Sequence, residues 1–123
     1  MRERVLIVED NKALAKLIAK KMNAHVDMDI VVTHSYAEAI EAIEENDDFF
    51  IALLDINLPD APDGEVVDYV LSKNILAIIL TGSVDENLKK LFIQKNIVDY
   101  VVKDNLDAIN YIFETINRLC RNR

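Results

Sequence analysis

Short apolar segments recur along this chain, and each is followed by residues with helical spacing. Five segments rich in β-branched residues predict strands at residues 5–8, 30–33, 49–54, 76–80 and 97–102. Between and after them, apolar residues return every three or four positions, as in amphipathic helices. Because strands buried on both faces in a parallel sheet need helical crossovers, the pattern predicts a doubly wound five-stranded α/β domain.

Length and composition are typical of one globular domain. The 123 residues are 51% hydrophobic and include only two Gly and two Pro, unlike a disordered chain. We therefore expect a single domain over residues 1–123, with no output domain in this chain. The 22 acidic and 14 basic residues give a net charge of −8, which argues against direct binding to nucleic acid.

The cysteine content and the first residues indicate the compartment. Cys120 is the only cysteine, so an internal disulfide framework is excluded. The opening MRERVLIVED leads directly into an apolar strand and not into a signal-peptide pattern, and the apolar runs are strand-sized. We expect a cytoplasmic protein without a membrane segment.

Polar side chains follow the predicted strands at the edge where an open α/β sheet binds its ligands. Glu9 and Asp10 follow the first strand, Asp55 the third, Thr81 the fourth and Lys103 the fifth. Singly, each is explained as a helix cap, a strand end or a solvated charge. Together they predict a site that binds Mg²⁺ through oxygen ligands and accepts a phosphoryl group on a carboxylate. Gly occurs only at positions 64 and 82, which argues against a glycine-rich nucleotide or flavin loop.

Four motifs resemble the receiver domain of two-component response regulators. They are VLIVEDN at 5–11, ALLDINLP at 52–59, IILTG at 78–82 and DYVVKD at 99–104. The resemblance covers nearly the whole chain and implies a flavodoxin-like sheet of order 2-1-3-4-5 with five helices. It also implies a phosphorelay protein whose partners are a histidine kinase or phosphotransfer protein and an output domain or downstream protein. The chain would then be a monomer or weak homodimer. It would not be an enzyme, because it would catalyse only its own phosphorylation and dephosphorylation.

The resemblance assigns a role to each residue of the metal and acceptor site. It implies that Asp55 is the phosphoacceptor and that Asp10, Asp55 and the backbone carbonyl of Asn57 bind Mg²⁺ directly. Glu9 would support the metal through water. These four residues form the predicted metal site.

The resemblance also implies a conformational switch. Thr81 and Lys103 would hold the phosphoryl oxygens, and Thr81 would form the switch with Tyr100. Movement of Thr81 toward the phosphoryl group would let Tyr100 turn inward and change the face formed by the fourth helix, the fifth strand and the fifth helix.

The sequence departs from the family at two loops. Asp104 stands where the family usually has a cis proline, so we expect a trans bond and a rearranged loop after Lys103. The segment LPDAPDG is one residue longer than usual between Pro59 and Gly64. Asn57 and Ser83 lie at positions that influence the phosphoryl lifetime in the family.

Two alternatives stay open from the sequence. A phosphatase with an aspartyl-phosphate intermediate would carry a second acid two residues after the nucleophile, where this chain has Asn57, and a cap domain. A phosphorylation-independent interaction domain would keep the fold without the chemistry, and Asp104 keeps this reading open. Failure to bind Mg²⁺ would favour the interaction domain.

Overall fold

Strands and helices alternate from one end of the chain to the other. The structure, a computed structural model, describes residues 4–82, 85–103 and 106–122. The elements are β1 (Arg4–Val8), α1 (Lys12–His25), β2 (Asp29–Thr33), α2 (Tyr36–Glu45), β3 (Phe49–Leu54), α3 (Glu65–Ser72), β4 (Leu76–Thr81), α4 (Glu86–Ile93), β5 (Asp99–Val102) and α5 (Leu106–Arg121). Within the described ranges, none of these helices combines the length and apolar character needed to cross a lipid bilayer.

The five strands form one parallel sheet in the order β2-β1-β3-β4-β5, which confirms the predicted 2-1-3-4-5 topology. Val8 lies opposite both Thr33 and Leu54, so the carboxyl ends of the three strands are level. The fifth strand begins at Asp99 and not at Ile97 as predicted, because the Ile97 amide donates to the Lys95 carbonyl in a turn after α4.

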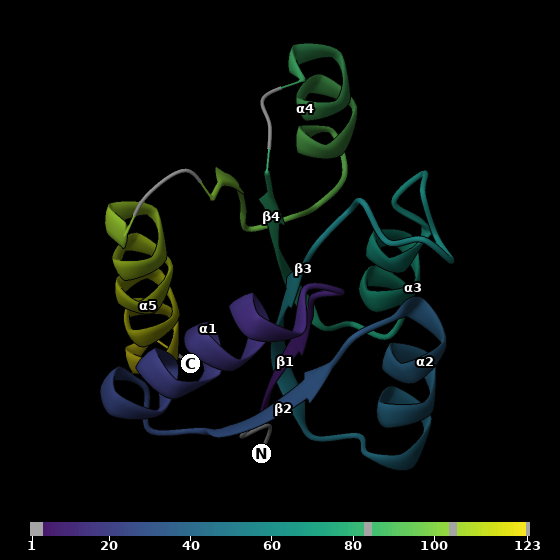
Figure 1. Cartoon of the computed structure of the whole chain (residues 1–123). Coiled ribbons are helices and arrows are strands. Elements are labelled where there is room, and N and C mark those ends of the chain that lie inside the picture. Colours follow the sequence, from purple (N-terminus) through teal and green to yellow (C-terminus); the bar gives the residue numbers. More distant parts are fainter. Residues whose placement is uncertain (1–3, 83–84, 104–105, 123) are drawn as a thin grey trace.

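Helices cover both faces of the sheet. α1 and α5 lie on one face, and α2 and α3 lie on the other (Figure 1). Two separate groups of buried side chains fill the two layers, one between the sheet and α1 and α5, the other between the sheet and α2, α3 and Phe92 of α4. This is the packing that fully apolar strands require.

Side chains cap the first turns of three helices, close to the strand ends. Asn11 accepts from the Leu14 amide at the start of α1, and Ser35 accepts from the Glu38 amide at the start of α2. Asp85 caps α4 in the same way. These caps satisfy helix amides that would otherwise lack a partner.

Candidate functional site

The sheet brings Glu9 and Asp55 together at its carboxyl edge. Glu9 directly follows β1 and Asp55 directly follows β3, which are neighbouring parallel strands. The Glu9 amide donates to the Thr33 carbonyl at 3.1 Å, and the Asp55 amide donates to the Val8 carbonyl at 2.9 Å. Backbone pairing thus continues past the strand ends and holds both residues in register.

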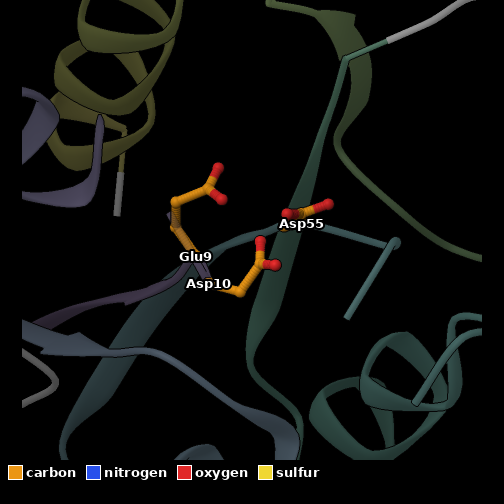
Figure 2. Close-up of side chains that lie close together, drawn as sticks. All are labelled: Glu9, Asp10 and Asp55. Atoms are coloured by element: carbon orange, nitrogen blue, oxygen red, sulfur yellow. The ribbon is translucent and has the colours of Figure 1, made fainter. Parts of the chain in front are cut away.

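Three carboxylates converge at this edge (Figure 2). Glu9, Asp10 and Asp55 each offer one oxygen within 4.8 Å of the others. Glu9 is 2% exposed and Asp55 is 4% exposed, whereas Asp10 is open to solvent. This oxygen-only donor set matches the preference of Mg²⁺, which keeps several waters and so needs an exposed side to its site.

Lys103 supplies the positive charge of the site. Its Nζ atom donates to Glu9 Oε1 at 2.5 Å and lies 3.7 Å from Asp55 Oδ2. Its side chain is 16% exposed, so the ammonium is largely shielded from water. The Lys103 amide donates to the Thr81 carbonyl at 2.7 Å, which extends the pairing of β4 with β5 and sets the side chain over the carboxylates.

Burial and hydrogen bonding shift the pKa values of Glu9 and Asp10 in opposite directions. Burial raises the pKa of Glu9 to about 7, although its hydrogen bond from Lys103 acts in the opposite direction. For Asp10, burial is outweighed by hydrogen bonding with Asp55 and Glu9, and its pKa lies below the usual value. A pKa of about 7 makes Glu9 the group of this cluster whose charge changes near neutral pH, so a cation that bound there would compete with a proton.

Thr81 and Tyr100 lie on the neighbouring strands β4 and β5. Thr81 ends β4 and is 2% exposed; Tyr100 pairs with Ile79 and is 7% exposed. Burial raises the pKa of Tyr100, and so does the negative charge of Asp85, while the Thr81 side chain acts in the opposite direction. The Tyr100 ring belongs to the same buried group as Phe92 and already lies inward, in the position that the resemblance implies only after phosphorylation.

The loop after β3 arranges the surroundings of Asp55. The Asn57 amide donates to Asp55 Oδ1 at 2.9 Å, so the Asn57 backbone lies against the central carboxylate. Gly64 has a φ of +75°, and a Cβ atom there would lie 2.4 Å from Phe92 Cζ. A glycine is therefore needed both for the backbone conformation and for the close approach of α4.

Sequence reasoning missed the role of Asp60 in this longer loop. Its carboxylate accepts from the Tyr36 and Ala37 amides, each at 3.0 Å, at the start of α2. These two bonds hold the pKa of Asp60 below its usual value. The only sequence signal for this contact is the general tendency of aspartate to cap helices. That tendency does not indicate which helix is capped, and here the helix begins more than twenty residues earlier in the chain.

Six of the predicted site residues lie together at the carboxyl edge, and Tyr100 lies beside Thr81 on β5; the six are Glu9, Asp10, Asp55, Asn57, Thr81 and Lys103. Ser83 and Asp104, with the bond between Lys103 and Asp104, lie outside the described residues.

The strand order and the acidic edge define a flavodoxin-like α/β domain. The sequence matches the response regulator receiver domain model over residues 5–114. The chain therefore belongs to the receiver-domain family of two-component response regulators. A comparison with curated proteins found no match.

Solved structures of response regulators share the fold. The signal receiver domain of a protein described as a Luxo repressor, from Vibrio parahaemolyticus, is 30% identical with a TM-score of 0.80, covering 96% of this chain and 92% of that one. The phosphorylated cyanobacterial phytochrome response regulator RcpA is 26% identical with a TM-score of 0.75, covering 94% and 91%. A protein described as a two-component system response regulator/GGDEF domain protein is 26% identical with a TM-score of 0.78, and 91% of this chain is covered. This chain spans 45% of the length of that last protein.

Proposed function

We propose that this receiver domain accepts a phosphoryl group on Asp55 from a histidine kinase or phosphotransfer partner. The observation that carries the proposal is the position of Asp55: buried, beside two further carboxylates, with Lys103 Nζ 3.7 Å from its Oδ2 atom. A carboxylate in this setting has an oxygen available as nucleophile and a cation beside it to offset added negative charge.

Asp10, Asp55 and the Asn57 carbonyl would hold Mg²⁺ directly, with Glu9 supporting it through water. The donor chemistry fits, because the described residues supply only hard oxygen ligands at the acidic edge. When bound, Mg²⁺ neutralises negative charge on the carboxylates and on the incoming phosphoryl group. The raised pKa of Glu9 fits the same role, since a cation there compensates charge that burial disfavours.

The transfer itself requires little of the protein beyond positioning and charge. An Asp55 oxygen attacks phosphorus, the new O–P bond forms as the donor's N–P or O–P bond breaks, and the leaving group departs with the electrons of that bond. The Lys103 ammonium would turn from Glu9 toward the phosphoryl oxygens. Thr81 would donate its hydroxyl hydrogen to one of these oxygens.

The response would pass through Thr81 and Tyr100. Both are buried and adjacent on β4 and β5, so a movement of Thr81 toward Asp55 changes the space available to the Tyr100 ring. The surface formed by α4, β5 and α5 would follow, and a downstream protein or output domain would read it. In this proposal the domain catalyses only its own phosphorylation and dephosphorylation.

The test is the intact mass of the protein after incubation with a small-molecule phosphodonor and Mg²⁺. We expect one phosphoryl adduct that is labile to base and absent from an Asp55→Asn variant. Asp63→Asn is the matched control, because Asp63 is exposed in the same loop and lies outside the acidic cluster. No adduct on the wild type, under conditions where another receiver reacts, would favour a phosphorylation-independent interaction domain.

A further inference from the structure

Helix α1 differs in charge from the rest of the molecule. It carries four lysines and no acidic residue, whereas the rest of the chain has 10 basic and 22 acidic residues. Lys12, Lys16 and Lys20 are exposed and follow one another at four-residue intervals, which places them along one side of the helix. None of the three forms an ion pair with a residue in the part of the chain that the structure describes.

These lysines border a groove between α1 and β2. The groove has a volume of about 570 Å³, with Ala19 on the α1 side and Val32 and His34 on the β2 side. The His34 ring, which lines the groove, also hydrogen-bonds the Glu9 carbonyl through Nδ1 at 3.0 Å. A groove with a mostly apolar lining and three exposed lysines on one side suits a ligand that has both an extended backbone and negative charges.

The other wall is an open sheet edge. Among the residues that the structure describes, β2 pairs with β1 alone, and its second edge has no neighbouring strand. The Thr33 carbonyl faces β1, where it accepts from the Glu9 amide. Because backbone groups alternate in direction along a strand, the amide and carbonyl of Val32 face the open edge. Such an edge is a template for the backbone of another chain.

We propose that an acidic, extended segment of a partner protein adds to β2 as a further strand and places its carboxylates against Lys12, Lys16 and Lys20. Lysines four apart on a helix are separated by about 6 Å along its axis. Side chains on one face of a strand repeat about every 6.7 Å. A segment with a carboxylate at every second residue therefore matches the lysines one to one.

Charge and hydrogen bonding select this occupant over others. A second copy of this chain has a net charge of −8, so two copies repel each other. Nucleic acid would satisfy the lysines, but it has no backbone that matches the alternating donors and acceptors of β2. The proposal is independent of phosphorylation at Asp55.

The probe is a labelled synthetic peptide that alternates threonine with glutamate, titrated with the full chain and followed by fluorescence anisotropy. A Lys16→Gln/Lys20→Gln variant should weaken binding about tenfold, since each ion pair adds to the affinity. A Lys89→Gln/Lys90→Gln variant, which removes two charges from α4, is the matched control and should bind as the wild type does.

Two backbone-methylated peptides separate strand addition from simple charge attraction. Methylation of the threonine amides alone, or of the glutamate amides alone, alters opposite edges of the added strand. One of the two peptides should lose binding and the other should keep it, and amide exchange at Val32 should slow in the complex.

Three results would overturn the proposal. The first is equal binding of both methylated peptides, which would indicate electrostatic contact without strand pairing. The second is equally tight binding of a single-stranded oligonucleotide. The third is no peptide binding together with self-association of the Lys16→Gln/Lys20→Gln variant, which would mean that the lysines only keep the open edge from pairing.

Discussion

Replacing Glu9 by glutamine should make the metal-free protein more stable near pH 8, although it removes the ion pair between Glu9 and Lys103. Glu9 is 2% exposed, and burial raises its pKa from 4.5 to about 7. A pKa change of this size corresponds to a cost of about 3 kcal/mol for keeping Glu9 ionised in the folded chain. Glutamine has nearly the shape of the protonated acid and carries no charge, so the variant avoids that cost.

The sign of the pH dependence follows from the same pKa. The folded protein binds this proton more tightly than the unfolded chain, so its free energy of unfolding should rise as the pH falls from about 8 to about 5. The pKa values of Asp10, Asp60 and Glu44 are lowered, so their stabilising effect is lost only as the pH falls below the usual values of 3.8 and 4.5. Of these four groups, Glu9 is the one whose shifted pKa changes stability between about pH 5 and pH 8.

The assay is urea denaturation in the presence of a chelator, repeated from about pH 5 to about pH 8. Glu9→Gln should flatten the trend, and Glu41→Gln, an exposed position on α2, should leave it unchanged. Added Mg²⁺ should stabilise the wild type more at the higher pH, because the cation displaces the proton. A wild-type free energy of unfolding that is constant or increases with pH in chelator would refute the reasoning.

Three further predictions concern the loops and the ammonium of the site. Gly64→Ala should lower the free energy of unfolding by about 2–4 kcal/mol, because the residue has a positive φ and a Cβ atom would block the approach of α4. Gly82→Ala is the control and should change this free energy little, since its Cβ atom would make only an ordinary contact. Urea denaturation of the two variants measures the difference. Asp60→Ala should speed hydrogen exchange at the Ala37 amide, measured by mass spectrometry, and an unchanged rate would contradict its capping role. Lys103→Gln should slow adduct formation on the acceptor by about a hundredfold with Mg²⁺ present, measured by intact mass over time, and an unchanged rate would exclude the ammonium from the transfer.

The strand ends could be predicted from sequence because each one is a local signal. A continuous apolar run that stops at a carboxylate, a threonine or a lysine identifies both the strand and the residue at its edge. Parallel pairing then brings Glu9, Asp55, Thr81 and Lys103 to one edge without further information. These local signals predict the alternation of strands and helices in a parallel sheet, whereas the confirmed order 2-1-3-4-5 is implied by the resemblance to receiver domains.

Contacts between loops and distant elements could not be predicted in the same way. Asp60, in the loop after β3, caps α2, which is distant from it in the sequence. The Lys103 ammonium lies closer to Glu9 than to Asp55. Both depend on loop conformation and on competition among nearby charges, and neither leaves a periodic pattern in the sequence. The inward position of Tyr100 depends likewise on packing with α4.

The charge of α1 also affects how quickly a partner can find this domain. A helix with four positive charges on a molecule of net charge −8 creates a large electric dipole, with its positive end at α1. In the field of an acidic partner the domain turns this helix forward before contact, so more encounters are productive. Association rates with such a partner should therefore decrease as salt is added, while dissociation rates should change much less.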